Sequence, residues 1–249
     1  MLKEERFQKL LNILAENEFV TVKTLSEKLH VSMPTIRRDL AELADQNQLQ
    51  RSHGGAMRLD EQYATTPLDF RRSINAKEKA AIAKAAVRFL RSNCVIFIDA
   101  STTAAHLIDY LDGFRDLIVI TNSLMFAAHL QSRGIRTYCL GGEVISSSVA
   151  VGGRIATEAA SNFNIDIMFF SSYGVNDQGM VVDTSEKENE LRRYILQHAG
   201  TSVFLCDKSK FGKNAVFNFA SLDHVDYMIT NGEVPEQYPR VRREVILAR

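Results

Sequence analysis

Apolar residues near the start of the chain recur at helical spacing in three segments. They are Phe7, Leu10, Leu11 and Leu14; Val22, Leu25 and Leu29; and Ile36, Leu40 and Leu43. Recurrence at intervals of three and four residues places such side chains on one face of a helix. Thr21 and Ser32 precede the second and third segments, where a hydroxyl oxygen can cap the first helical turn. We therefore predict three short helices, the third of which turns its apolar face into a small core.

The third predicted helix carries a basic outer face. Pro34 falls in its first turn, where a missing N–H costs little. On a helical wheel Pro34 and Arg38 lie opposite the apolar stripe, and Thr35 and Arg37 flank it. Guanidinium and hydroxyl groups are the ones that reach guanine edges and phosphates in the major groove. Two short helices joined by a brief turn are typical of a helix-turn-helix, whose second helix would here begin at Ser32. The alternative is an ordinary surface helix with two solvated arginines.

A polar stretch with a Gly-Gly pair follows and predicts a β-hairpin. A hairpin directly after a recognition helix is a wing, in which Arg51 and His53 could contact phosphates or the minor groove. For His53 the competing interpretation is a solvent-exposed loop residue. We predict a DNA-binding domain over residues 1–58, with the helix-turn-helix at about 20–39 and the wing at about 48–58.

Residues 59–76 are polar and without clear periodicity, which predicts a linker, and a second domain is expected over 77–249. That domain alternates helical patterns with short apolar runs. The runs occupy residues 95–98, 117–120, 137–140, 167–170, 203–206 and 227–229. Continuous β-rich runs of this kind predict buried parallel strands with helices on both faces, a doubly wound α/β domain.

Polar motifs follow several of these runs, at the ends where such sheets bind ligands. Their residues are Asp99, Ser101, Thr102 and Thr103; Thr121, Asn122 and Ser123; Gly141 and Gly142; and Lys210. Hydroxyls and free amides at a helix N-terminus suit a phosphate, and a lysine supplies a cation. The alternative for each hydroxyl cluster is a plain helix cap. Two clusters and a lysine at the same edge favour a pocket.

Composition narrows the possibilities only a little. The chain has 249 residues, 45% of them hydrophobic, and a formal net charge of zero, which is typical of a soluble globular protein and gives no hint of nucleic acid or membrane. No apolar run approaches the ~20 residues of a membrane helix, so we expect a cytoplasmic protein. The three cysteines are expected to be buried thiols, with no disulfide, metal or cofactor.

The motifs together resemble one known family. Thr-Ile-Arg-Arg-Asp-Leu (35–40), followed by Arg-Ser-His-Gly-Gly-Ala (51–56), resembles the DeoR/GlpR family of bacterial transcription regulators. Further family positions are matched by Pro67, Arg71, Asn75, Glu78, Lys79 and Ile82, and by the motifs at 99–103, 121–123, 141–142 and 207–212, in the family's order. The resemblance covers essentially the whole chain.

The resemblance implies a function. Such proteins carry a winged helix-turn-helix and a C-terminal domain similar to type A ribose-5-phosphate isomerase, which binds a phosphorylated sugar and holds an oligomer together. We expect a repressor of a sugar-catabolic operon that the sugar phosphate releases from double-stranded operator DNA. Operator half-sites require at least two heads, so a homodimer or homotetramer is expected.

Two alternatives stay open. An isomerase would need an acid–base carboxylate, but the corresponding stretch at 171–176 has none, and Glu186, Glu188 and Glu190 are interpreted as a solvated acidic first turn of a helix. We therefore expect no enzymatic activity. The second alternative is a regulator whose pocket has lost its ligand, because Ser-Ser-Tyr-Gly stands at 171–174 where many family members have Gly-Ala-Asp-Gly. Tyr173 would add a ring and a hydroxyl to the pocket wall.

Overall fold

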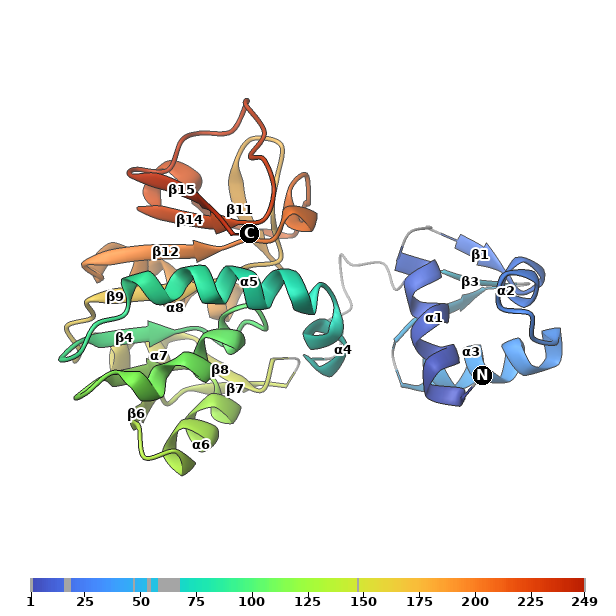
Figure 1. The fold of residues 1–249 in the computed structure, drawn as a ribbon, viewed down its shortest axis with the longest axis horizontal. Helices are drawn as coiled ribbons and strands as arrows, with labels where there is room; N and C mark the ends of the chain where they lie inside the picture. Colours follow the sequence, from blue (N-terminus) through green and yellow to red (C-terminus); the bar gives the residue numbers. More distant parts are fainter. Residues whose placement is uncertain are drawn as a thin grey trace. The chain divides into compact units, whose positions relative to one another are not determined.

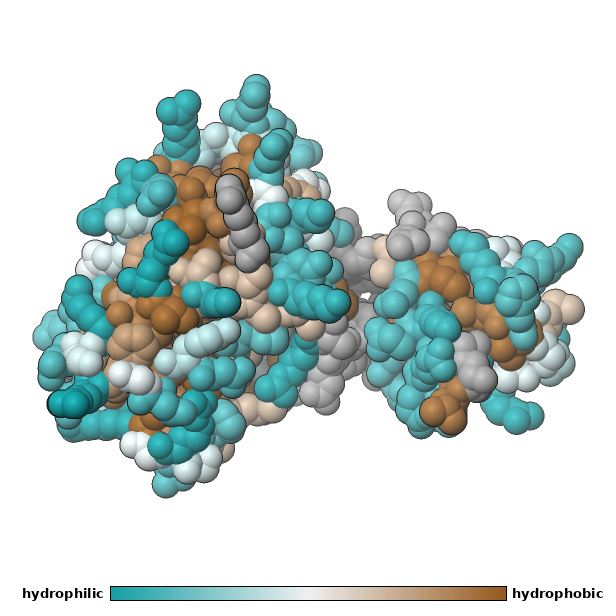
Figure 2. All heavy atoms as spheres, in the orientation of Figure 1, coloured by the Kyte–Doolittle hydropathy of each residue, from teal (hydrophilic) through white to brown (hydrophobic). Residues whose placement is uncertain are grey.

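The computed structural model describes residues 2–15, 19–46, 48–52, 55–57, 68–146 and 148–248. The chain divides into two compact units, Met1–Pro67 and Leu68–Arg249. Polar side chains cover most of the visible surface of both units, with apolar atoms between them (Figure 2). Within the described ranges, no helix is long and apolar enough to cross a membrane.

The first unit is a winged helix-turn-helix. Its helices are α1 (Lys3–Ala15), α2 (Val22–Leu29) and α3 (Met33–Asp45), and its strands are β1 (Phe19–Thr21), β2 (Gln50–Ser52) and β3 (Gly55–Met57). The strands form an antiparallel sheet in the order β1-β3-β2 (Figure 1). The helices and the hairpin confirm the prediction, whereas strand β1 was not predicted. Three residues are too short a segment to show a periodicity.

Most of the core of the first unit comes from the predicted apolar stripes, to which Val20, Leu49 and Ala56 add. Leu10, Leu25, Ile36 and Leu43 are fully buried, and each such side chain contributes roughly 1.5–3 kcal/mol relative to exposure. The Thr21 hydroxyl accepts a hydrogen bond from the Thr24 amide and starts α2. Packing and capping therefore orient α3 relative to α2 through residues that the sequence pattern already marks.

A parallel seven-stranded sheet organises the second unit, in the order β15-β14-β12-β9-β4-β5-β6. The strands are β4 (Val95–Ile98), β5 (Ile118–Thr121), β6 (Arg136–Cys139), β9 (Ile167–Phe170), β12 (Thr201–Leu205), β14 (Tyr227–Thr230) and β15 (Glu244–Leu247). The six predicted strands are confirmed to within two residues. The edge strand β15 was missed, although Val245, Ile246 and Leu247 form a short apolar run; most of its side chains are exposed.

Helices cover both faces of this sheet, as predicted. The covering helices are α5 (Ala76–Ala86), α6 (Leu124–Ser132), α7 (Arg154–Ala160), α8 (Glu186–His198) and the 3-10 helix η2 (Ala104–Gly113). Three shorter 3-10 helices are η1 (Val87–Phe89), η3 (Lys208–Lys210) and η4 (Leu222–His224). Phe97 of β4 joins the core beneath α7 and α8, whereas its neighbours Ile96 and Ile98 join the core beneath α5 and η2 (Figure 1). Alternate side chains of one strand thus support the two opposite faces.

Short antiparallel elements complete the second unit. They are the hairpin of β7 (Glu143–Ile145) and β8 (Ala150–Gly152), and the sheet of β10 (Gly174–Val175), β11 (Met180–Asp183) and β13 (Phe217–Ser221). Within the expected linker, residues 59–67 lie outside the described ranges and Leu68–Ser73 form helix α4. Asn75, with a φ of 51°, separates α4 from α5.

Strand β6 differs from the prediction. It was expected to be buried, but it is the edge strand of the sheet and most of its side chains are exposed. Cys139 is therefore exposed, and only Cys94 and Cys206 are buried thiols. Strand β6 reads Arg-Thr-Tyr-Cys, and at the edge of the sheet a strand is less completely enclosed than a central one, so most of its side chains stay exposed.

Candidate functional site

The predicted recognition helix is α3, and its start is built as expected. The Ser32 hydroxyl accepts a hydrogen bond from the Thr35 amide at 3.4 Å, and the two hydroxyl oxygens lie 2.8 Å apart. Pro34 stands in the first turn. Arg37 and Arg38 are exposed, so both guanidinium groups are available to a ligand. Helix α3 therefore presents a hydroxyl and two cations on its outer face.

Asp39 ties α3 to α1 through an ion pair with Arg6. The side chain is buried, and its Oδ1 accepts a hydrogen bond from Arg6 Nη2 of α1 at 2.9 Å, beside a second bond from Arg6 Nε. A two-pronged ion pair of this kind fixes orientation as well as distance. Arg6 was missed by the sequence analysis, because nothing in the local pattern links it to a residue 33 positions away.

The wing residues are only partly described. Arg51 lies in β2, paired with Ala56 of β3. His53 lies outside the described residues. Their assignment to DNA contact therefore stays a prediction.

In the second unit, Asp99 lies at the end of β4 and is completely buried. Its Oδ1 accepts a hydrogen bond from the Ser101 amide at 3.2 Å, and its Oδ2 accepts one from the Ser171 amide at 3.2 Å. Arg192 Nε also donates to Oδ2, at 3.1 Å. Asp99 thus holds together the loops after β4 and β9, and its carboxylate faces a buried cation.

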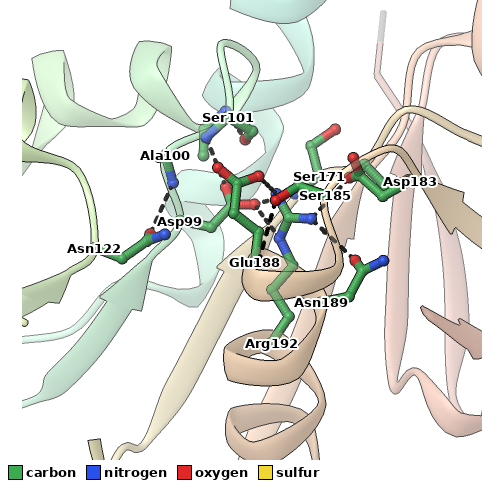
Figure 3. Close-up of polar contacts among 12 residues, drawn as sticks. Asp99, Ala100, Ser101, Asn122, Ser171, Asp183, Ser185, Glu188, Asn189 and Arg192 are labelled. Carbon is green, nitrogen blue, oxygen red and sulfur yellow. Dashed lines mark hydrogen bonds and ion pairs between the residues drawn. The ribbon is translucent and has the colours of Figure 1, made fainter. Parts of the chain in front are cut away.

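Arg192 is the centre of a buried ionic cluster (Figure 3). Its Nη1 lies 2.7 Å from Asp183 and its Nη2 lies 3.2 Å from Glu188, in addition to the contact with Asp99. The expectation of a solvated acidic turn is wrong for Glu188, which is only 6% exposed. Helix α8 turns this residue inward, where the Ser148 hydroxyl also donates to it. Glu188 and Arg192 stand four residues apart, and this spacing was the one sequence signal for their pairing.

Burial and charge oppose each other in this Arg192 cluster. Burial raises the pKa of Asp99 and of Glu188, while the guanidinium of Arg192 lowers both. Burial by itself lowers the pKa of Arg192, but Asp183, Asp99 and Glu188 together hold it above its ordinary value. Three carboxylates surround one cation, so the cluster carries an excess of acidic groups.

The polar side chains that follow β5 make hydrogen bonds to neighbouring backbone groups. Asn122 Oδ1 accepts from the Ala100 amide at 3.1 Å, and its Nδ2 donates to the Val151 carbonyl at 3.1 Å. The Thr121 hydroxyl donates to the Ile98 carbonyl, and Ser123 caps α6. These side chains are buried and brace the strand ends.

The hydroxyls after β4 have different surroundings. Ser101 Oγ accepts from the Ala104 amide at 3.2 Å, at the start of η2. Thr103 Oγ1 is buried and has no hydrogen-bond partner within the described ranges. Thr102 Oγ1 accepts from Lys79 Nζ at 3.0 Å. The helix that follows this motif, η2, is a 3-10 helix.

Two lysines lie at the carboxyl ends of the strands. Lys79 of α5 is only 4% exposed, and burial lowers its pKa to about 8, with Lys210 and Arg71 acting in the same direction and Asp207 against it. Lys210 Nζ donates to Ser171 Oγ at 2.9 Å and also to the Ser172 carbonyl. The predicted cation Lys210 therefore lies beside a second cation.

Lys79 was not among the predicted site residues, although a signal was present. It shares the buried face of α5 with Ile82, Ala83 and Ala86, at helical spacing. A lysine on an apolar face is rarely buried without a specific reason. Ser171 was missed as well, because only the tertiary fold brings it to Lys210.

The remaining predicted effector residues are two glycines and Tyr173. Gly142 has a φ of +139°, and a Cβ atom on it would lie 2.7 Å from the Gly152 carbonyl oxygen, so the absence of a side chain permits this close approach. A Cβ atom on Gly141 would have no described atom within 4 Å, so this position does not require glycine for space. Tyr173 is half-buried, and its amide donates to Asp183 Oδ2 at 3.3 Å.

A cavity of about 340 Å³ lies beside the polar motifs. Its lining residues are Arg72, Thr102, Ala105, His106, Ile108, Asp109, Met125, Phe126 and His129. Thr102 is the only predicted effector residue among them. The described geometry therefore places Lys79, Lys210 and the Arg192 cluster outside this cavity.

Comparison with known proteins settles the family. Residues 6–62 match the DeoR-like helix-turn-helix domain, and residues 74–232 match the DeoR C terminal sensor domain. The chain belongs to the DeoR family of transcriptional regulators. It is 32% identical to the HTH-type transcriptional regulator GolR of Listeria innocua, over 94% of this chain and 92% of that protein. It is 30% identical to the Glycerol-3-phosphate regulon repressor of Escherichia coli, over 94% and 93%, and 29% identical to the repressor GlcR of Bacillus subtilis, over 95% and 91%.

Solved structures give a looser likeness for this DeoR-family chain. A ribose-5-phosphate isomerase of Methanocaldococcus jannaschii aligns over 55% of each chain, with 18% identity and a TM-score of 0.42. The eIF2B delta subunit of Chaetomium thermophilum aligns over 64% of this chain and 58% of its own, with 14% identity and a TM-score of 0.44. At this level the likeness carries no argument about ligand or activity. The α/β fold class rests on the strand order itself.

Proposed function

We propose that this DeoR-family regulator represses a sugar-catabolic operon and leaves its operator when a phosphorylated sugar binds the second unit. The proposed DNA contacts come from Ser32, Pro34, Thr35, Arg37 and Arg38 of α3, with Arg51 and His53 of the wing. The proposed ligand site lies at the carboxyl ends of β4, β9 and β12. It uses Lys79, Thr102, Ser171 and Lys210.

One observation carries the ligand proposal. Lys79 is buried, its pKa is lowered to about 8, and Lys210 contributes to that lowering. The two ammonium groups repel each other, Asp207 offsets part of that repulsion, and a bound anion would relieve more of it. The hydroxyls of Thr102 and Ser171, already bonded to these two ammonium groups, can turn to donate to phosphate oxygens. The Glycerol-3-phosphate regulon repressor among the relatives is consistent with this ligand class.

An isomerase is the second candidate, and the carboxylates argue against it. Asp99, Asp183 and Glu188 all engage the guanidinium of Arg192. A general base must be free to take a proton from its substrate. Carboxylates held in an ion-paired cluster are poorly suited to that role, and the relatives are named as transcriptional regulators, so we propose that the protein is not an enzyme.

Assembly and location follow from operator binding. A helix-turn-helix reads one half-site, and two half-sites spaced by a helical turn require two heads. We therefore propose a homodimer or homotetramer held by the second unit. The regulator acts where its DNA lies, in the bacterial cytoplasm.

Operator release tests this function. The purified protein is bound to fluorescent DNA from upstream of its own coding region, at fixed salt because phosphate contacts make affinity salt-dependent. A panel of sugar phosphates is then titrated, with the matching unphosphorylated sugars as controls, and anisotropy is followed. We expect one phosphate ester to release the DNA and its parent sugar to have no effect. Tight binding that no compound reverses would contradict the effector proposal and leave the DNA-binding head in place.

A further inference from the structure

Helix α4 (Leu68–Ser73) is held at its C-terminal end by the groups that form the candidate ligand site. Lys79 Nζ donates a hydrogen bond to the Arg71 carbonyl, while the same ammonium donates to Thr102 Oγ1 at 3.0 Å. One buried cation is therefore shared between α4 and the loop after β4.

A second tie lies just beyond α4. Asn75 Nδ2 donates to Asp207 Oδ1 at 3.2 Å and to Ser209 Oγ at 2.9 Å. Asp207 and Ser209 belong to the turn that carries Lys210, since the Asp207 carboxylate also accepts from the Ser209 amide at 3.1 Å. A change in the position of Lys210 therefore acts directly on Asn75.

The side chain of Arg71 adds an electrostatic link. It is half-buried, and burial lowers its pKa, while Glu188, Asp183 and Asp99 raise it. These are the carboxylates of the Arg192 cluster, which carries an excess of acidic groups. Helix α4 thus contributes a positive charge to the same edge of the sheet.

The contacts of α4 matter because of where this helix lies in the chain. Residues 58–67 join the DNA-binding unit to α4, so α4 is the first described element of the second unit that the connection reaches. An element that both a ligand and the connection can act on is what coupling between two sites requires.

We propose that α4 couples ligand binding to operator release, with Asn75 as a positioning residue. An anion at Lys79 and Lys210 competes with the Arg71 carbonyl for the Lys79 ammonium and shifts the turn that holds Asn75, which releases α4. A charged phosphate oxygen is a stronger acceptor than a neutral carbonyl, so the exchange favours the ligand. The ligand role in this inference rests on the proposed function; the link between α4 and the DNA-binding unit does not.

The test substitutes Asn75→Gly in the full-length protein. Glycine tolerates the positive φ of 51° at this position, so the backbone is kept and only the side-chain tie is lost. Asn93→Gly is the matched control, because Asn93 has a φ of 56°, is exposed, and its side chain makes no hydrogen bond within the described ranges. Both variants are measured for thermal stability, for operator affinity without ligand, and for binding of inorganic phosphate and of the sugar phosphate panel.

We expect Asn75→Gly to bind the operator about 5-fold or more weakly without ligand, and to bind the anion more tightly, because loss of the tie favours the state in which α4 is released. Asn93→Gly should match the wild type in both. Hydrogen exchange of peptide amides in 68–75 should quicken when the wild-type protein binds the anion.

Three results would overturn the inference. They are an unchanged operator affinity for Asn75→Gly, an equal loss in both glycine variants, and exchange in 68–75 that the bound anion leaves unchanged. Failure of the wild type to bind any phosphate compound would instead contradict the proposed function, while a weakened operator affinity of Asn75→Gly would still establish the link from α4 to the DNA-binding unit.

Discussion

Arg192 Nε and Asp99 Oδ2 lie 3.1 Å apart although the two residues are separated by 93 positions in the sequence. Both are buried, and the Ser171 amide donates to the same carboxylate oxygen. The contact joins α8 to the loops that follow β4 and β9. The shape of the candidate site edge therefore depends on one cation that itself is closed off from solvent.

Replacing Arg192 with Met tests this dependence. The change removes the guanidinium that all three carboxylates contact, and breaking a buried ion pair in this way costs about 3–5 kcal/mol. Burial already raises the pKa of Asp99 and of Glu188, and loss of the guanidinium raises both further. Protonation then becomes favourable in the folded state, so the loss of stability should be smallest in acid and grow as the pH rises. Urea unfolding at several pH values measures it.

Glu190→Gln is the control for this variant, because Glu190 lies on the same helix and is exposed. Its effect on stability should be within about 0.5 kcal/mol. Arg192→Met with wild-type stability at neutral pH would show that the cluster does not need its cation.

Lys79→Met should make the protein more stable at pH 7 while removing the response to ligand. The pKa of Lys79 is lowered from 10.5 to about 8, so below pH 8 the folded protein holds a charge that burial disfavours. This cost is present below pH 8 and fades as the pH rises from about 8 to 10.5. A gain of about 1–3 kcal/mol at pH 7 is expected, which shrinks toward pH 10.

Thermal and urea unfolding of Lys79→Met are compared with those of Lys84→Met, an exposed lysine on the same helix. The control should change little at any pH. If Lys79→Met is strongly destabilised, the ammonium is mainly a structural donor to Thr102 and Arg71, and its proposed role in the ligand site must be revised.

Arg37→Ala or Arg38→Ala should weaken operator binding and leave the second unit's ligand binding unchanged. Each guanidinium that reaches a base edge contributes about 1–3 kcal/mol. Anisotropy at matched salt gives the affinity, and Arg154→Ala, an exposed arginine of α7, controls for loss of charge. Unaltered operator affinity in both α3 variants would remove α3 from the DNA-binding surface.

Lys210→Ala should blunt induction while operator binding persists. The ammonium contacts Ser171 and the Ser172 carbonyl, so its loss removes a cation from the proposed phosphate site without touching α3. Lys208→Ala is the matched control, because Lys208 is exposed and lies in the same 3-10 helix. Release of operator DNA by the ligand is measured for both variants. If Lys210→Ala and Lys208→Ala both respond to the ligand as the wild type does, Lys210 is excluded from the site.

Local patterns predicted the first unit well. The stripe of Ile36, Leu40 and Leu43 and the caps at Thr21 and Ser32 are all found as expected. Helix periodicity and capping depend on residues within a few positions of one another, so short stretches of sequence are enough to predict them. The continuous apolar runs predicted the central parallel strands for the same reason.

Edges and charged interiors were harder to predict. Strand β6 was expected to be buried but lies at the edge of the sheet, where Cys139 is exposed, and the edge strand β15 was missed. Burial at an edge depends on which strand lies next to it, and the order of strands is not a local property. The inward turn of Glu188 was misjudged because its partners come from distant loops.

The sequence by itself determined the three helices of the first unit, the central strands of the second, the order of the motifs and the family, because each depends on residue types at short, fixed spacing. The tertiary structure decided which polar groups meet. It buried Lys79 against Thr102, closed Arg192 among three carboxylates and joined Asn75 to the turn of Lys210. The free energy of a buried charge depends on its neighbours in space, and those neighbours are fixed only when the sheet brings its strand ends to one edge.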